Sequence, residues 1–367
     1  MNPYFSIIIP YHNSKDTIGP LLDSIAVSEK APLLEVIVVD DGSEKPANNV
    51  IPAPHQRAGS TPAGILKIPH HVRDDKMMKW KTLDVRIHTL FYNKGPGAAR
   101  NRGAGIAKGK FLVFFDSDVV LFPDALHNLW QIYEDDPDIV AVTGVWVKHQ
   151  KTKKFFPNFK ALRDWSYWIN ERDKSGYYYL FSTRCASIKR EVFERLKGFD
   201  ETYTSPLVED IEFTYRVARR YAIIFAPNVR VHHEFEDFLP IAKKYFWRSY
   251  FWTKLYQSRK KFDPVATTLQ EAVTALSGVG IVLMSLIVPI FGVMSYELRV
   301  KTDYVHLFYI LTLTSYLLTL VVHLFFTRKF LAFVYQEKGI WFAIKSFFTG
   351  LVLYCFIAAG AVWGRIH

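Results

Sequence analysis

Short apolar runs alternate with amphipathic segments in the N-terminal part of the chain, up to about residue 265. The first apolar run is Ser6–Pro10, and Ile18, Leu21, Leu22 and Ile25 follow it at helical spacing. A strand pattern that alternates with a helix pattern predicts an α/β domain with a mainly parallel sheet. Ligands bind beyond the carboxyl ends of the strands in such sheets, so the polar residues at those ends are candidates for function.

The pattern continues along this part of the chain. We expect further strands at 36–39, 85–91, 111–115 and 222–225, a Gly/Ala-rich helix at 96–107, and a helix opened by Pro123. Residues 44–80 are rich in Pro, Gly and charge, and we expect an irregular insertion there.

Long apolar spans replace this pattern near the C-terminus, at 272–294, 304–326 and 341–363. Each is long enough to cross a hydrocarbon core of roughly 30 Å, although the third carries Lys345 near one end. We therefore divide the chain into an α/β domain (1–235), a connecting segment (236–265) and a membrane region (266–367) with two to three helices.

The connecting segment is both basic and aromatic. Residues 241–262 contain lysine and arginine but no acid, and tyrosine, phenylalanine and tryptophan lie among them. Cations flank the cytoplasmic ends of membrane helices, so the α/β domain is expected at the cytoplasmic face of the cell (inner) membrane, in a multi-pass protein. The segment fits a membrane interface, with a solvated linker helix as the alternative. Its place beside a span favours lipid over nucleic acid.

Net charge and cysteine content narrow the partners. The formal net charge is +11 and the sequence pI about 9.3, which favours an acidic partner such as a nucleotide or an anionic lipid. The two cysteines, Cys185 and Cys355, lie far apart in the chain. Neither a disulfide framework nor a cysteine-rich zinc site is expected.

An Asp-x-Asp motif follows the apolar run at 111–115. Asp116 and Asp118 lie one residue apart, so they can share a divalent cation that prefers oxygen ligands, Mg²⁺ or Mn²⁺. Such a metal neutralises the charge on a departing diphosphate. A turn or a helix cap is the alternative reading of the same residues.

Other polar residues follow the first strands. Asp40 and Asp41 could accept hydrogen bonds from a base or a ribose, although Asp-Gly is also a strong turn signal. The segment from Pro10 through Tyr11 to Asn13 could supply an aromatic face for a base. Arg100, in a glycine-containing run, could bring a guanidinium to phosphate.

Two further candidates lie later in the chain. Glu209 and Asp210 follow a plausible helix start, where acids suit the helix dipole or, alternatively, provide a general base. His232 and His233 are expected after the strand at 222–225, and either could reach the metal or a phosphate. We take His232 as the candidate metal ligand, beside Asp116 and Asp118. A polar histidine at a strand end is the structural alternative.

Taken together and in order, these motifs resemble glycosyltransferase family 2 over about residues 3–235. The matching segments are Ser6–Asn13, Val39–Ser43, Asn93–Gly95 leading to Ala99–Asn101, Phe115–Asp118, Gly198–Glu201 and Glu209–Asp210. The resemblance implies a GT-A fold, a nucleotide-sugar donor (a UDP- or GDP-sugar) and single-displacement transfer with inversion.

The resemblance also implies roles for particular residues. Pro10, Tyr11, Asp41 and Arg100 would hold the nucleotide. Asp116 and Asp118 would hold nucleotide and metal, Asp210 would be the base, and Glu209 would be its neighbour. The segment 181–185 departs from the small residues usual in the acceptor loop. The Gln-x-x-Arg-Trp signature of processive synthases is absent as well.

We therefore expect a metal-dependent enzyme of glycan or glycolipid biosynthesis that moves one sugar. The expected acceptor is a hydroxyl of a lipid or lipid-linked saccharide, because an anionic phosphate would need little help from a base. The alternatives are a polyprenyl-phosphate glycosyltransferase and a processive polysaccharide synthase. A membrane scaffold with a decayed pocket is less consistent with the intact Asp116, Asp118 and Asp210. A nucleotidyltransferase, which would release pyrophosphate instead of a nucleoside diphosphate, is a further alternative.

Overall fold

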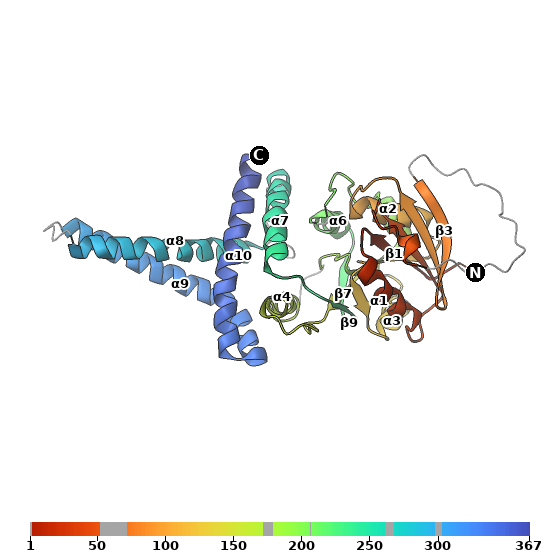
Figure 1. The fold of residues 1–367 in the computed structure, drawn as a ribbon, viewed down its shortest axis with the longest axis horizontal. Helices are drawn as coiled ribbons and strands as arrows, with labels where there is room; N and C mark the ends of the chain where they lie inside the picture. Colours follow the sequence, from red (N-terminus) through yellow and green to blue (C-terminus); the bar gives the residue numbers. More distant parts are fainter. Residues whose placement is uncertain (1, 52–71, 172–178, 206, 261–267, 298–302) are drawn as a thin grey trace, which may run out of the picture. The chain divides into compact units, whose positions relative to one another are not determined.

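The structure is a computed structural model that describes residues 2–51, 72–171, 179–205, 207–260, 268–297 and 303–367. Its contacts define two units (Figure 1). The first unit comprises Met1–His149 and Ser175–Glu234, and the second comprises Gln150–Lys174 and Phe235–His367. Residues 150–174 thus group with the C-terminal helices by contact, whereas the division from sequence kept them in 1–235.

The first unit alternates strands with helices. Its strands are β1 (Phe5–Tyr11), β2 (Leu34–Asp40), β3 (Val72–Trp80), β4 (Leu83–Leu90), β5 (Phe111–Phe115), β6 (Val119–Leu121), β7 (Ala141–Trp146), β8 (Cys185–Lys189) and β9 (Ile223–His233). Its helices are α1 (Lys15–Ala26), a 3₁₀ turn (Ala47–Asn49), α2 (Pro96–Ile106), α3 (Ala125–Asp135), α5 (Arg190–Arg195) and α6 (Glu209–Ala218).

All these strands form one sheet in the order β3-β4-β2-β1-β5-β8-β7-β9-β6. The pairs β1–β2, β1–β5, β2–β4 and β7–β9 are parallel, and the pairs β3–β4, β5–β8, β6–β9 and β7–β8 are antiparallel. The α/β class expected from the sequence is confirmed, and the sheet is mixed: its parallel half carries β4, β2, β1 and β5. The carboxyl ends of these four strands therefore meet at one edge.

Two local predictions were wrong. Residues 72–80 of the expected irregular insertion form strand β3, which extends the sheet beside β4, whereas 52–71 lie outside the described residues. The strand expected at 222–225 continues to His233, so both histidines belong to β9. The longer strand is stabilised by pairing with β7 and then with β6.

The core of this unit consists of strand residues packed against helices α2, α5 and α6. Phe114, Phe181, Phe193, Phe199 and Phe213 form a buried aromatic cluster with mutual ring distances of 4.7–6.5 Å. Burying a phenylalanine stabilises a fold by roughly 1.5–3 kcal/mol. Because α6 contributes Phe213 to this cluster, its first turn is fixed relative to the end of β5.

The second unit is helical. It contains α4 (Phe155–Ser166), a π-helical turn (Tyr167–Glu171), α7 (Phe238–Arg259), α8 (Leu269–Glu297), α9 (Asp303–Lys338) and α10 (Ile340–Ile366). Three stretches are long and apolar enough to cross a membrane: Leu269–Val293, His306–Lys338 and Ile340–Ile366, with mean hydropathies of 2.3, 1.9 and 1.8. The predicted apolar helices are confirmed and extend beyond the predicted bounds.

Helices α8 and α9 lie side by side, and α10 crosses them and runs next to α7 (Figure 1). A buried cluster joins α4, α7, α9 and α10 through Phe159, Ile241, Val334 and Ala343 among others. Many apolar side chains on the outer faces of α8 and α9 are exposed, such as Leu286 (64%) and Leu318 (64%). Exposed apolar surface of this extent indicates a membrane environment.

Candidate active site

The Asp-x-Asp motif lies at the carboxyl end of β5, in the middle of the sheet. β5 ends at Phe115, and β6 begins at Val119, so Asp116 and Asp118 occupy the turn between them. Their side chains are 31% and 48% exposed. Both carboxylates thus remain open to a ligand at the edge where ligands bind in α/β sheets.

Arg100 joins this motif to the first turn of α6. Its Nη2 donates to Asp116 Oδ1 at 2.6 Å and its Nη1 donates to Glu209 Oε1 at 3.0 Å, while its side chain is only 2% exposed. Because a buried guanidinium needs carboxylate partners, this contact holds two distant motifs in one site. The structure thus gives Arg100 carboxylate partners, where the sequence suggested a phosphate.

The two histidines of β9 have different partners. His233 Nε2 lies 3.3 Å from Asp118 Oδ2, whereas His232 Nε2 lies 2.7 Å from Glu234 Oε1. Neighbouring side chains of a strand point to opposite faces, so only one of them approaches the Asp-x-Asp turn. The metal role assigned to His232 from the sequence therefore suits His233 better. Burial and then the charge of Arg184 lower the pKa of His233, which favours the neutral imidazole.

The first acidic pair is buried and bound to backbone amides. Asp40 accepts from the amides of Ser43 (3.0 Å) and Ala47 (2.7 Å). Asp41 accepts from the amides of Lys94 (2.8 Å) and Gly95 (2.9 Å), and burial raises the pKa of its carboxyl group. In this arrangement the two side chains shape the loops after β2 and β4.

The end of β1 presents a different aromatic ring from the one expected. Tyr11 is fully buried and its hydroxyl donates to the carbonyl of Lys45 at 2.9 Å, so its ring offers no open face for a base. Pro10 is partly buried, whereas His12 and Asn13 are exposed. The exposed ring after β1 is therefore that of His12.

His12 connects three loops through its two ring nitrogens. Nδ1 lies 3.0 Å from the carbonyl oxygen of Asp41, and a carbonyl only accepts, so Nδ1 carries the hydrogen. Nε2 then accepts from the side-chain amides of Asn13 (3.3 Å) and Asn93 (3.2 Å). These loops follow β1, β2 and β4, so this network shapes the sheet edge beside the Asp-x-Asp turn.

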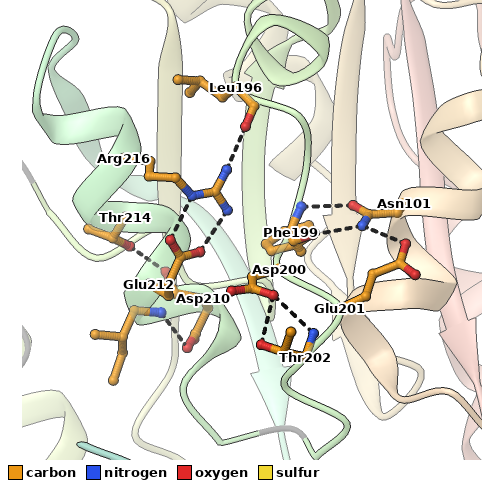
Figure 2. A network of polar contacts seen from close by, with 11 residues as sticks. Asn101, Leu196, Phe199, Asp200, Glu201, Thr202, Asp210, Glu212, Thr214 and Arg216 are labelled. Carbon is orange, nitrogen blue, oxygen red and sulfur yellow. Dashed lines mark hydrogen bonds and ion pairs between the residues drawn. The ribbon is translucent and has the colours of Figure 1, made fainter. Parts of the chain in front are cut away.

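Figure 2 shows how α2 holds the segment before α6. Asn101 accepts from the amide of Phe199 at 2.8 Å and donates to its carbonyl at 2.8 Å, and it also donates to Glu201 at 3.0 Å. Gly198 has φ +63°, and a Cβ there would lie 2.3 Å from Asn101 Oδ1. The Gly-Phe-Asp-Glu motif is thus an anchor for the chain that leads into α6.

Asp210 lies in the first turn of α6, next to Glu209. Its Oδ1 accepts from the amide of Ile211 at 2.8 Å (Figure 2). Glu212, in the same first turn, is held by Arg216 through two contacts of 2.7 and 2.6 Å. Arg100 thus holds Glu209, and Arg216 holds Glu212.

A cation, Arg184, directly precedes strand β8. This strand pairs with β5 so that Cys185 faces Phe115, the last residue before the Asp-x-Asp turn. The Arg184 Cζ atom lies 4.5 Å from the ring centroid of Trp146, at the end of β7. This stacked arginine occupies the position where the sequence departs from small residues, and its charge reaches His233.

The donor set around the turn suits a hard divalent cation. It contains two partly exposed carboxylates, Asp116 and Asp118, with the imidazole of His233 next to the second. Among the described residues, no three His, Cys, Asp or Glu side chains gather at metal-ligand spacing. Mg²⁺ and Mn²⁺ commonly take one or two carboxylates and complete their shell with substrate phosphates and water, so the residues fit such an ion.

Comparison with known proteins identifies the domain. Residues 6–56 and 75–197 match the sequence model of a family described as "Glycosyl transferase family 2". The chain carries a glycosyl transferase family 2 domain. The matched residues include the acidic pair after β2, Arg100, the Asp-x-Asp turn and Arg184. The resemblance inferred from the motifs is therefore confirmed at the level of the family.

Curated relatives of this family 2 domain act in several glycan systems. The succinoglycan biosynthesis protein ExoO of Rhizobium meliloti is 32% identical over 150 residues, which are 39% of this chain and 35% of that protein. The glucosyl-dolichyl phosphate glucuronosyltransferase of Haloferax volcanii is 27% identical over 190 residues, 46% of this chain and 58% of that protein. The matched region thus spans about a third of the length of the first relative and somewhat over half of the length of the second.

A solved structure shares the fold. The mannosyltransferase PcManGT from Pyrobaculum calidifontis, in complex with GDP-Man and Mn²⁺, has a TM-score of 0.51 and 17% identity. The comparison covers 100% of this chain and 88% of that protein. The GT-A-like arrangement followed by long apolar helices is therefore confirmed as a fold.

Proposed function

We propose that this family 2 glycosyltransferase transfers a single sugar from a UDP- or GDP-sugar to a hydroxyl of a lipid or lipid-linked saccharide, with inversion. The observation that carries the proposal is the bridge from Asp116 through Arg100 to Glu209, at 2.6 and 3.0 Å. It joins the two carboxylate motifs that such a transfer needs, one for the leaving diphosphate and one for the attacking hydroxyl.

The nucleoside would lie over the loops after β1, β2 and β4. Pro10, Tyr11, Asn13, Asp40 and Asp41 are proposed to act there, largely through the loop shapes that their hydrogen bonds fix. Arg100 would act by positioning Asp116 and Glu209. Asp116, Asp118 and His233 would hold Mg²⁺ or Mn²⁺, which neutralises charge on the diphosphate when bound.

Asp210 is the proposed general base. It would take the proton from the acceptor hydroxyl while the oxygen bonds to the anomeric carbon on the side opposite the diphosphate. The bond from the anomeric carbon to the phosphate oxygen breaks, and its electron pair leaves with the nucleoside diphosphate. Glu209 cannot share this role easily, because Arg100 neutralises it in a buried site.

The acceptor is proposed to reach the site from the membrane. Three stretches that could span a membrane and the cations of α7 support a position at the cytoplasmic face of the inner membrane. A named activity on glucosyl-dolichyl phosphate in one relative supports a lipid-linked acceptor. Arg184 gives polyprenyl phosphate itself some support as a second candidate acceptor, since a stacked guanidinium suits a phosphate.

The test uses the full chain in lipid nanodiscs, with nucleotide sugars, membrane lipid extracts and mass spectrometry of the products. We expect one added sugar and release of a nucleoside diphosphate, dependent on Mg²⁺ or Mn²⁺. Asp210→Asn should lower turnover by about 10²–10⁴-fold and keep nucleotide binding. Asp200→Asn is the matched control, because that acid accepts from the backbone amide and the hydroxyl of Thr202.

Three outcomes would contradict the proposal. Near-normal turnover of Asp210→Asn would remove the base assignment. Long polymeric products would indicate a processive synthase, and pyrophosphate release would indicate a nucleotidyltransferase.

A further inference from the structure

Helix α10 has the length and hydropathy of a membrane span, yet its contacts place both of its ends beside helices that precede the first span. We propose that α10 lies along the membrane interface together with α7. Only α8 and α9 would then cross the bilayer, and the C-terminus would lie on the same side of the membrane as α7. The occupant of the free apolar face of α10 would be the acyl boundary of that leaflet.

The start of α10 follows directly from the end of α9. Gly339 alone separates the two helices, and the ring of Phe342 lies 4.7 Å from that of Phe155 in α4. Near the end of α9, Phe330 lies 5.9 Å from Phe159 of the same helix α4. The α9–α10 junction is therefore next to α4.

The end of α10 contacts α7. A Cβ at Gly360 would lie 2.1 Å from the carbonyl oxygen of Phe246, and one at Gly364 would lie 2.5 Å from that of Tyr250. Lys254 Nζ also lies 3.3 Å from the carbonyl oxygen of His367. Glycines four residues apart allow two helix backbones to approach closely, so this half of α10 is fixed along α7.

The order of the helices along the chain indicates which of them share one side of the membrane. Helices α4 and α7 both precede α8, and among the described residues no candidate span precedes it, so α4 and α7 share one side. If α8 and α9 each cross once, the chain returns to that side at Gly339. A helix with both ends on that side does not cross the hydrocarbon core, so α10, about 40 Å long, would lie along the membrane surface.

The positive charges of α7 disfavour an arrangement in which α7 and α10 both cross the bilayer. Helix α7 carries five cations and no acid: Lys243, Lys244, Lys254, Arg248 and Arg259. Each cation at the centre of a bilayer costs roughly 2.5–3.5 kcal/mol or more. These cations instead suit the phosphates at a membrane surface, and the aromatic residues of α7 suit the same depth.

The two faces of α10 differ in the way that an interfacial helix requires. Gly360 and Gly364 lie on the face that packs against α7, with Leu353 (3% exposed) on the same side. An exposed stripe of α10 consists mainly of large apolar side chains: Trp341, Phe348, Val352, Val362, Trp363 and Ile366. Two cations are also exposed, Lys345 near the start of the helix and Arg365 near its end. Water would not cover this stripe favourably, whereas the acyl region of a leaflet would.

The centre of α10 crosses helices α8 and α9, the two proposed membrane spans. Phe347 and Tyr354 lie seven residues apart, yet their rings lie 5.8 and 5.5 Å from the same ring, that of His323 in α9. Helices packed side by side would pair these residues with different turns of α9. Figure 1 shows the same relation, with α10 crossing α8 and α9.

The first test labels single cysteines with a membrane-impermeant maleimide. The full chain carries Cys185→Ser and Cys355→Ser, and separate variants add His367→Cys, Glu236→Cys or Asp303→Cys. Glu236 precedes α7, and Asp303 begins α9, at the end that would lie on the opposite side of the membrane. We expect positions 367 and 236 to react in the same vesicle orientation and position 303 in the other. Reaction of 367 together with 303 would overturn the proposal.

The second test measures depth by spin-label power saturation, with labels at Trp341→Cys, Phe348→Cys and Val362→Cys in the same background. A helix along the interface gives three similar shallow depths. A crossing helix would place the label at 348 much deeper than the other two, and full access of a water-soluble relaxant to all three would show that no leaflet covers the stripe. Either result would overturn the proposal.

Glycine variants test the contact that fixes α10 on α7. Gly360→Leu should lower the melting temperature of the protein in nanodiscs and deepen or disorder the label at 362. Gly350→Leu is the control, because a Cβ there would meet Tyr354 only at an ordinary 3.7 Å. Equal behaviour of the two variants would contradict the packing on which the proposal depends.

Discussion

Two acidic pairs follow strands of the same sheet, and their surroundings differ. Asp40 and Asp41 are 0% and 3% exposed, and their oxygens accept from four backbone amides. The side chains of Asp116 and Asp118 are 31% and 48% exposed, and they contact the side chains of Arg100 and His233 respectively. The first pair builds loops, and the second is available to a ligand.

The difference shows that an acid after a strand is not sufficient to define a ligand site. Backbone amides satisfy a carboxylate permanently, because they belong to the loop that it stabilises. A side-chain partner leaves other lone pairs of the carboxylate for a metal or a substrate. Replacing Asp40 or Asp41 should therefore mainly affect stability, whereas replacing Asp116 or Asp118 should mainly affect catalysis.

The largest expected effect is on catalysis, from the second pair. Asp118→Asn should lower turnover by about 10²–10³-fold, because charge on the leaving diphosphate loses one of its stabilising groups. The melting temperature should change little, since this side chain is half exposed. Steady-state kinetics with a thermal melt checks both parts, and a large loss of stability with normal turnover would reverse our distinction.

The next effect comes from the residue that orients the second pair. Arg100→Lys keeps the charge but cannot bridge Asp116 and Glu209 with two separate nitrogens, so turnover should fall by about 10–100-fold. Arg86→Lys is the matched control at a bidentate pair with Asp75 away from the site. Equal kinetics of the two variants would argue against a positioning role for Arg100.

The first pair should affect stability. In Asp41→Asn, one of the two carboxylate oxygens becomes an NH₂ group. This donor faces a backbone N–H, so the unfolding free energy should fall by about 1–3 kcal/mol. Burial raises the pKa of Asp41 above its ordinary value of 3.8. This group's stabilisation is therefore present at low pH and lost as the pH rises through its raised pKa.

Thermal melts of Asp41→Asn and the unsubstituted protein across pH test this point. The difference between the two proteins should be largest at low pH and shrink as the pH rises from about 4. A difference that grows with pH would mean that the carboxylate is held mainly in its charged form by the amides of Lys94 and Gly95.

The smallest effect is expected at His12, whose ring connects the loops after β1, β2 and β4. His12→Phe keeps a ring of similar shape and removes the contacts to Asp41, Asn13 and Asn93. The KM for the donor should rise about 10-fold, on the basis of roughly 0.5–1.5 kcal/mol per lost hydrogen bond, while kcat stays nearly constant. An unchanged KM would show that these loops keep their shape without His12.

Local patterns predicted much of the fold. Strand β5 and helix α2 have nearly the predicted bounds because a dense apolar run, and a proline at a helix start, are strong local signals. The antiparallel half of the sheet was not predicted, since the pairing of β8 with β5 and β7 depends on contacts between distant segments. The same reason explains β3, whose charged residues resemble a loop.

Much of the candidate site was also indicated by sequence, but particular partners were not. The choice between His232 and His233 depends on which face of β9 each occupies, and this follows from the register of β6 with β9. Arg184 and His12 were missed as site residues because each matters only through neighbours from other strands. A cation directly before β8 was the one sequence signal that could have identified Arg184.

The third apolar span illustrates a limit of hydropathy. Trp341 and Trp363 flank an apolar run, which is typical of a helix that crosses between two interfaces. The same pattern also fits a helix that lies along one interface. Gly360 and Gly364 distinguish the two only once their contact with α7 is known.

The most direct test of the account is calorimetric binding of GDP and UDP, each with and without Mn²⁺, to the full chain and to Asp118→Asn. We predict that at least one nucleotide binds the unsubstituted protein and that Mn²⁺ strengthens this binding. In Asp118→Asn the strengthening by Mn²⁺ should disappear. The same enhancement in both proteins would contradict the claim that the acidic pair after β5 holds the metal and the diphosphate.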